Sequence, residues 1–369
     1  MKLKRCSFKF WIFLLMQISS SEIYCQAIDL KTEIEKLIRF DTEIDFRKVP
    51  GFIVTVIDND SIYFFSFGTK VKKEKIDFKK NDIFEIGSVS KVFTASLISI
   101  LVDEGLISYS DRVNSYFPEE YQNPRLNNLT ISDLITHQSG MPRLPGFFGK
   151  KEKDFQNPYK NYQYNDLLTF YRDFIPENKE FQYSHTNYGL LELILKKRTS
   201  KSLQDLMEEK IFSPLGMSDS FIDFPEKKEN VISPGYDRAQ KPVQPWTFSS
   251  FKASEGIKLS ADDMTKFLKA NMNMSDSGLD EIFKYNFTPQ LNTGFNTQLS
   301  VAMGWHTINM NHFHIITHTG KTSGHNAFVG MVRETKTAVV ILANSSFGTE
   351  DLGIQILRMI NYNWKRINI

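Results

Sequence analysis

The chain has 369 residues, of which 41% are hydrophobic and 13% aromatic, with 31 phenylalanines among them. This composition supplies a large core and excludes an intrinsically disordered chain. The formal net charge is only +2, and no basic patch points to nucleic acid as a partner.

The first 25 residues differ from the rest of the chain. Four cationic residues precede a run of nine mostly apolar residues at 10–18, and serines follow it at 19–21. This layout predicts a secretory signal peptide over 1–25, since the apolar run is too short to span a bilayer. The alternative is a buried N-terminal helix. With cleavage between Ser21 and Ala27, we expect an exported periplasmic or extracellular protein without stable membrane insertion.

Both cysteines, Cys6 and Cys25, lie in or at the end of this leader. The mature chain would therefore contain neither a disulfide nor a thiol nucleophile. The leader carries four cations and one acidic residue, a net +3, so its removal takes the formal charge from +2 to −1.

The residue patterns that follow predict alternating helical and strand-rich segments. Hydrophobic spacing predicts a helix at 28–40, a β-hairpin over 51–68 that turns at 58–60, and an apolar helix over 88–104 that Gly105 ends. The region after residue 110 is mostly helical, with helices at 187–197 and 202–211. Strands return after residue 296, with a second hairpin over 326–346 that turns near 335–336 and a final helix at 350–366.

These elements define an α+β fold with strands at both ends of the chain. We expect one domain over 28–369, in which an antiparallel sheet flanked by helices is joined to an all-α lobe. The sheet part would comprise about 28–110 and 246–369, and the lobe about 111–245.

A candidate nucleophile lies at the start of the third element. Ser88 and Lys91 are three residues apart, so a helix places the ammonium group beside the hydroxyl. A free serine hydroxyl is a weak nucleophile, and a lysine activates it by taking its proton or by lowering the pKa of a neighbour. A second Ser-x-x-Lys string at 249–252 precedes a glycine-containing loop instead of a long apolar helix, and we regard it as accidental.

Longer segments carry a family resemblance. Residues 84–91, FEIGSVSK, resemble the active-site signature of class C β-lactamases and the related D-Ala-D-Ala carboxypeptidases and esterases. Similar segments follow in the family's order: 134–141 (LITHQSGM), 214–217 (PLGM), 304–305 (GW) and 318–320 (HTG). The resemblance covers about residues 30–365. It implies a β-lactamase/transpeptidase-like fold and a small-molecule or peptidoglycan-like substrate, and we expect no metal or cofactor.

The family's Tyr-x-Asn motif corresponds to Tyr183 and His185. The resemblance implies that the Tyr183 phenolate is a general base, and such ionisation needs a nearby cation, which Lys91 could supply. His185 replaces the asparagine that orients the lysine and the substrate amide, and its protonated form would be a like charge near Lys91. Literal Tyr-x-Asn strings at 121–123 and 159–161 lack a following apolar helix. The alternative for Tyr183 is an ordinary buried tyrosine.

The third motif reads His318-Thr319-Gly320, where many β-lactamases carry Lys-Thr-Gly and the peptidase and esterase relatives often carry His-x-Gly. The resemblance implies an edge strand facing the serine, on which glycine lets the substrate approach the backbone. His318 would recognise a substrate carboxylate or polarise the site around Tyr183; the alternative is a structural strand histidine. The N–H groups of Ser88 and Lys321 would form the oxyanion hole.

Other polar residues have simpler interpretations. A zinc site at His312, His314 and His318 is conceivable, but no Asp or Glu lies within that stretch. We expect His137 to pack structurally where its loop turns. Glu255 stands where relatives often carry Gly-Gly, and we expect an exposed loop residue there rather than one that lines the cleft.

The leading hypothesis is an exported serine hydrolase. Ser88 attacks an amide or ester carbonyl, Tyr183 and Lys91 shuttle the proton, and water hydrolyses the acyl-enzyme. The resemblance implies β-lactams or related amides as substrates, with a D-Ala-D-Ala carboxypeptidase, D-aminopeptidase or esterase as alternatives. A non-catalytic cell-wall-binding homologue and a zinc hydrolase are the remaining alternatives.

Overall fold

The computed structural model describes residues 29–146, 157–177, 180–224, 232–288, 291–293 and 298–367. The leader predicted over 1–25 lies outside the described residues. Within these described ranges, no helix is both long enough and apolar enough to cross a membrane.

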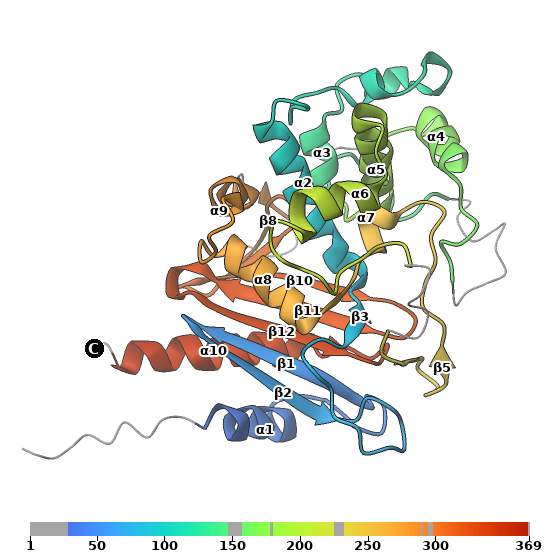
Figure 1. Cartoon of the computed structure of the whole chain (residues 1–369). Coiled ribbons are helices and arrows are strands. Elements are labelled where there is room, and N and C mark those ends of the chain that lie inside the picture. Colours follow the sequence, from blue (N-terminus) through green and yellow to red (C-terminus); the bar gives the residue numbers. More distant parts are fainter. Residues whose placement is uncertain are drawn as a thin grey trace, which may run out of the picture.

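The centre of the fold is an eight-stranded antiparallel sheet with the strand order β2-β1-β12-β11-β10-β9-β8-β7 (Figure 1). Strand β1 pairs with both β2 and β12, so the two ends of the chain meet within one sheet. The strands are β1 (Gly51–Asp58), β2 (Ser61–Gly68), β7 (Leu291–Asn292), β8 (Leu299–Val301), β9 (His306–Asn309), β10 (His314–Lys321), β11 (Asn326–Val332) and β12 (Thr337–Ala343).

Both predicted hairpins are confirmed. Strands β1 and β2 meet at a tight turn in which Asn59 has a φ of 50°, a left-handed conformation that asparagine tolerates. Strands β11 and β12 are joined by the 3-10 turn Arg333–Thr335 and by Lys336, whose φ is 51°. Alternate residues of a strand point to opposite faces, so each central strand contributes to two cores.

One face of the sheet is covered by α1 (Leu30–Phe40) and α10 (Glu350–Ile367) (Figure 1). Ile34 and Ile38 are one helical turn apart and pack into the same core as Leu352 and Ile356. Full burial of such a side chain contributes about 1.5–3 kcal/mol. The helices predicted at the two ends of the chain are thus confirmed, and both hold the sheet from the side away from Ser88.

The other face is covered by α2 (Ser90–Asp103) and α8 (Ala261–Asn271). Helix α2 is buried over nearly its whole length, which explains why apolar residues surround it instead of forming a stripe. Its core continues into the helical lobe above the sheet (Figure 1). The remaining helices are α3 (Ile131–Ile135), α4 (Tyr164–Asp173), α5 (His185–Thr199), α6 (Leu203–Met207), α7 (Lys252–Glu255) and α9 (Leu279–Phe283).

The region predicted as helical is less regular than expected. Residues 113–126 form three short 3-10 turns, and the helix predicted over 202–211 consists of α6 followed by the π-helical turn Glu208–Phe212. Two small sheets were not predicted: β3 (Ile83–Glu85) with β6 (Lys258–Ser260), and β4 (Gly235–Tyr236) with β5 (Pro242–Val243). Pairing of β3 with β6 joins the segment before Ser88 to the segment after α7.

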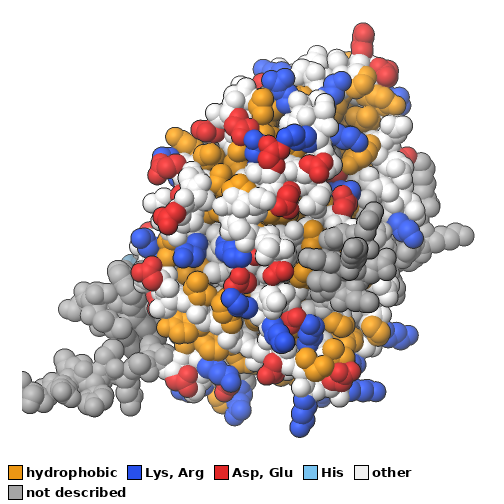
Figure 2. Space-filling view, in the orientation of Figure 1, with side chains coloured by type: hydrophobic (Ala, Val, Ile, Leu, Met, Phe, Trp, Pro, Cys, Tyr) orange, Lys and Arg blue, Asp and Glu red, His pale blue; other side chains and the backbone are white. Residues whose placement is uncertain are grey.

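The surface carries charges of both signs. Over the described residues on the face in Figure 2, Lys and Arg side chains are interspersed with Asp and Glu side chains. Such mixing produces no broad field of one sign on that face.

Candidate active site

A tight backbone turn places Ser88 between β3 and α2. Ser88 lies in the 3-10 turn Gly87–Val89, and the Ile86 N–H before it donates to the Ile257 carbonyl, 3.2 Å away. Gly87 has a φ of 50°, and a Cβ there would lie 2.6 Å from the Lys321 nitrogen. This position therefore requires glycine for both its conformation and its contact with β10.

Strand β10 runs directly beside this turn. A Cβ on Gly320 would lie 1.9 Å from the Ile86 carbonyl oxygen and 2.9 Å from the Ser88 nitrogen. Glycine is thus required here by the approach of the Ser88 turn, whereas the family resemblance implies that it admits a substrate to the backbone. Among the described strands, β9 pairs with β10 only as far as Thr317, so the predicted edge is present from His318 to Lys321.

The turn and the strand edge border a cavity of about 410 Å³. Lys91 lies beneath it and is completely buried. The structure thus brings all the predicted site residues together, since the cavity is lined by Ser88, Tyr183, His185, His318, Thr319, Gly320 and Lys321.

Lys91 lies one helical turn from Ser88, as the spacing predicts. Its Nζ is 3.2 Å from Ser88 Oγ, 3.1 Å from the Ser254 carbonyl oxygen and 3.0 Å from Glu255 Oε1. An ammonium group has three N–H donors and no lone pair, so these three acceptors match its full donor set.

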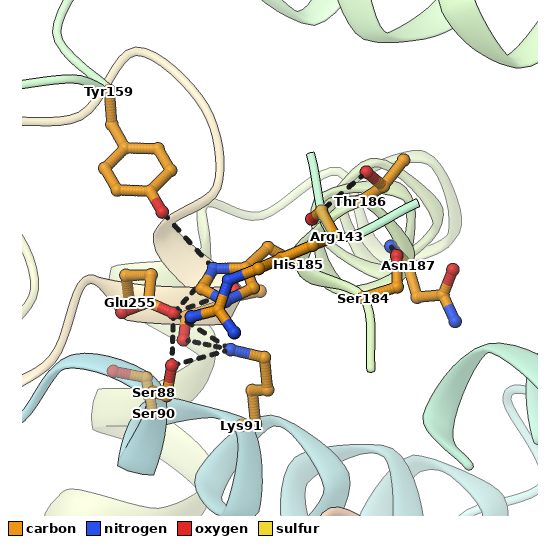
Figure 3. A network of polar contacts seen from close by, with 12 residues as sticks. Ser88, Ser90, Lys91, Arg143, Tyr159, Ser184, His185, Thr186, Asn187 and Glu255 are labelled. Atoms are coloured by element: carbon orange, nitrogen blue, oxygen red, sulfur yellow. Dashed lines mark hydrogen bonds and ion pairs between the residues drawn. The ribbon is translucent and has the colours of Figure 1, made fainter. Parts of the chain in front are cut away.

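Glu255 is the site residue that the sequence analysis missed, and the expectation of an exposed loop residue is wrong. It ends α7 and is only 3% exposed, and its side chain points into the cluster of Ser88, Lys91 and His185 (Figure 3). Oε1 lies 2.5 Å from Ser88 Oγ, which donates to it, and 2.8 Å from His185 Nδ1.

Glu255 is held in its ionised form by its neighbours. Burial alone raises the pKa of this carboxyl, but the charge of Lys91 and the hydrogen bonds from His185 and Ser88 outweigh it, so the pKa lies well below its ordinary value. The sequence does contain a signal for this group. Glu255 stands where relatives often carry glycine, and His185 stands where they carry asparagine, so two departures from the family pattern occur together.

His185 opens α5, whose start is capped by the Ser184 hydroxyl. Burial and the Lys91 charge lower the pKa of His185 to about 4, although Glu255 acts in the opposite direction. At neutral pH the ring is therefore uncharged, so His185 does not place a second positive charge beside Lys91. A carboxylate only accepts, so Nδ1 carries the proton toward Glu255, with the Tyr159 hydroxyl 3.2 Å away. Nε2 is buried without a hydrogen-bond partner among the described residues.

Tyr183 lies just before α5 and is supported by His137. The His137 ring centre is 4.6 Å from that of Tyr183, and its Nδ1 accepts a hydrogen bond from the Ser184 N–H at 3.0 Å. His137 thus has the structural place expected for it. Lys91 Nζ lies 5.1 Å from the Tyr183 ring centre. Within the described part of the chain, no hydrogen bond joins the Tyr183 hydroxyl to Ser88 or Lys91.

His318 is a buried, neutral imidazole. Burial, His306 and Lys91 hold its pKa well below the ordinary value. Its Nδ1 donates to the Thr319 carbonyl at 2.7 Å, and Nε2 has no partner among the described residues. A neutral ring lacks the charge that carboxylate recognition uses, and its unprotonated Nε2 is a hydrogen-bond acceptor instead.

The other sequence candidates lie apart from this cluster. Exposed His314 faces Glu334 at 3.1 Å, and no trio of His, Cys, Asp or Glu side chains in the described part of the chain is arranged to hold a metal ion. Lys252 of the second Ser-x-x-Lys string pairs with Asp223 at 2.6 Å.

The antiparallel sheet, the helical lobe and the serine–lysine pair between them define a serine hydrolase of the β-lactamase type. The family model described as Beta-lactamase matches residues 39–361, and the chain belongs to this family of class C β-lactamases, D-Ala-D-Ala carboxypeptidases and esterases.

Similar proteins cover nearly the whole chain. A β-lactamase of Pseudomonas fluorescens is 26% identical over 336 residues, which cover 82% of this chain and 90% of that protein. A class C β-lactamase structure superposes with a TM-score of 0.78 at 22% identity, covering 90% of this chain and 98% of the other. A β-lactamase/D-alanine carboxypeptidase from Pseudomonas syringae gives 0.73 at 19% identity, covering 89% and 97%. At these identities the two structures establish the α+β fold.

Proposed function

We propose that this protein hydrolyses β-lactam or related amide bonds through an acyl-enzyme on Ser88. One observation carries the proposal: Ser88 lines a cavity, its hydroxyl contacts buried Lys91, and it lies beside the edge of β10 that β9 leaves unpaired beyond Thr317 among the described strands. Such an edge can pair with an extended substrate, which would place its carbonyl carbon at the nucleophile.

The reaction begins with attack of Ser88 Oγ on the carbonyl carbon. The oxyanion that forms is held by the N–H groups of Ser88 and Lys321, whose backbones meet at the Gly87 contact. Collapse breaks the C–N bond, and water then releases the acyl group and restores the hydroxyl. In this scheme Tyr183 and Lys91 flank the reacting atoms.

The substrate class rests on the relatives and on the cavity lining. Class C β-lactamases and a β-lactamase/D-alanine carboxypeptidase share the fold, which supports a β-lactam or a peptidoglycan-like substrate. Neutral His185 and His318, at positions of the usual asparagine and lysine, favour the alternatives of a D-Ala-D-Ala carboxypeptidase, D-aminopeptidase or esterase. We assign His185, His318, Thr319 and Gly320 to substrate contact.

We also propose that the protein is exported to the periplasm or the cell exterior. The cationic and apolar layout of residues 1–25 supports this placement. The bacterial β-lactamases among its relatives are consistent with it.

Fluorescent penicillin tests the nucleophile. We expect covalent labelling of the mature wild-type protein and none of Ser88→Ala. An unlabelled wild type, together with no product burst on an activated ester, would favour the non-catalytic alternative. Comparing turnover of a chromogenic cephalosporin, D-Ala-D-Ala peptides and p-nitrophenyl esters then identifies the substrate class.

A further inference from the structure

We propose that Glu255 is the catalytic base for Ser88 and that His185 is its positioning residue. This inference rests on the proposed acyl-enzyme function and names the group that receives the hydroxyl proton. It assigns that role to a carboxylate, where Tyr183 and Lys91 were the residues expected from the sequence.

The contacts of Ser88 Oγ identify the acceptor. Within the described residues, its side-chain contacts are Glu255 Oε1 at 2.5 Å and Lys91 Nζ at 3.2 Å. Lys91 donates all three of its N–H bonds and has no lone pair to offer. The remaining partner is an ionised carboxylate, already aligned as the acceptor of the Ser88 hydroxyl hydrogen.

Tyr183 is less suitably placed for this step. Its ring presents a face to Lys91, and no hydrogen bond to Ser88 is present among the described residues. It lines the cavity beside Ser88 and can contact a bound substrate there.

His185 fixes the carboxylate through the Nδ1 contact at 2.8 Å. Together with Ser88 and Lys91, it gives Oε1 three close donors, which converge from α5, the 3-10 turn Gly87–Val89 and α2. The Ser254 hydroxyl donates to the same oxygen from 3.4 Å. In the family, an asparagine orients the lysine, and His185 stands at that position in this chain. Here Glu255 accepts the hydrogen bond from Lys91 instead. Glu255 and His185, the two departures from the family pattern, therefore act together.

Glu255 carries the proton in both halves of the proposed reaction. Oγ forms a bond to the carbonyl carbon, its proton passes to Glu255 Oε1, and the carbonyl electron pair moves to the oxygen. When the C–N bond breaks, the same proton passes to the leaving nitrogen. In deacylation Glu255 takes a proton from the attacking water, and Ser88 Oγ recovers it as the acyl–oxygen bond breaks.

The isosteric variant Glu255→Gln tests the base. It keeps an oxygen beside Lys91 but cannot take a proton at neutral pH, so the second-order rate constant for labelling by fluorescent penicillin should fall at least about 100-fold. In Glu255→Ala, added formate should restore labelling at least about tenfold and saturably, because formate supplies the missing carboxylate.

Glu192→Gln is the matched control. Glu192 is another buried glutamate; its Oε2 accepts from the Ala253 N–H at 3.2 Å, so it braces the same helix α7, and it does not contact Ser88. We expect its labelling rate to stay within about threefold of wild type.

The outcomes separate this inference from the proposed function. An unlabelled wild type that also gives no product burst on an activated ester would refute the acyl-enzyme itself. A labelled wild type with equally fast Glu255→Gln would overturn only the role of Glu255. Folded Glu255→Ala that formate fails to rescue would also overturn the base role, since a positioning carboxylate alone would then explain the loss.

Discussion

Two buried clusters in this protein use the same three residue types and differ in what their polar atoms contact. The site cluster is Glu255, His185 and Lys91, and the bracing cluster is Glu85, His325 and Lys258. The two clusters are bridged by the β3–β6 pairing, which brings Glu85 beside Lys258 only a few residues from Ser88 and Glu255.

In the bracing cluster the polar groups meet structural partners. Glu85 accepts hydrogen bonds from the Trp246 N–H at 2.6 Å, the Thr322 hydroxyl at 2.8 Å and His325 Nδ1 at 3.1 Å. His325 Nε2 lies 2.9 Å from the Ser233 carbonyl oxygen. The contacts of Glu85 tie strand β3 to the segments that carry Trp246, Thr322 and His325, and none of the three cluster residues lines the cavity.

In the site cluster one buried polar atom lacks a structural partner. His185 Nε2 is without a hydrogen bond in the described part of the chain, and the residues Ser88 and His185 both line the cavity. An unpartnered buried polar atom costs about 1–3 kcal/mol. The same residue types therefore stabilise the fold where all their hydrogen bonds are made, and they support chemistry where some are left open to a substrate.

The largest contrast is expected from matched lysine substitutions. Lys91→Met should lower the labelling rate by fluorescent penicillin on the order of 1000-fold, because Ser88 and Glu255 lose their shared cation. Lys258→Met should stay within about tenfold of wild type, since Lys258 contacts the Ile222 and Gly256 carbonyls instead of Ser88. Circular dichroism checks that both variants fold. If both folded variants lost the labelling rate to the same extent, the proposed difference between a catalytic cluster and a structural cluster would be wrong.

Glu85→Gln should affect stability instead of chemistry. The carboxylate of Glu85 accepts from three donors, and in the variant the amide N–H groups would face some of these donors without forming hydrogen bonds. The free energy of unfolding should therefore fall by about 2–3 kcal/mol. Urea unfolding at pH 7 measures this loss. Labelling per folded molecule should remain within about threefold of wild type; a loss of labelling without a loss of stability would assign Glu85 to the chemistry.

The sequence predicted what local patterns determine. Runs of β-forming residues on either side of a turn predicted the β1–β2 and β11–β12 hairpins, and i to i+3 spacing predicted that Lys91 contacts Ser88. Strand β3 has only three residues, too few for such a run to be visible, and its partner β6 lies far along the chain.

Glu255 is the site residue that no local pattern of the sequence places. It is separated from Ser88 by 167 positions, and only the β3–β6 pairing and α7 bring it into contact. A lone glutamate next to a glycine has no periodicity that reveals burial, so composition favoured an exposed loop. The His185 pKa could not be derived either, because it depends on burial and on Lys91.

The smallest expected effect concerns Lys258 and its titration. Burial lowers the pKa of Lys258 to about 8, although Glu85 and Asp223 act to raise it. The unfolded chain therefore binds a proton that the folded protein releases between about pH 8 and the ordinary lysine value, and the free energy of unfolding rises with pH across that window. Relative to Lys258→Met, wild type should gain about 1 kcal/mol between pH 8 and pH 9.

Urea unfolding of wild type and Lys258→Met at each pH measures the difference in the free energy of unfolding. Subtracting the values of the variant cancels the titrations that the two proteins share. Parallel curves would show that Lys258 does not release its proton on folding. The Lys258 ammonium would then be compensated by Glu85 and by its two carbonyl partners, and the two clusters would differ only in their access to the cavity.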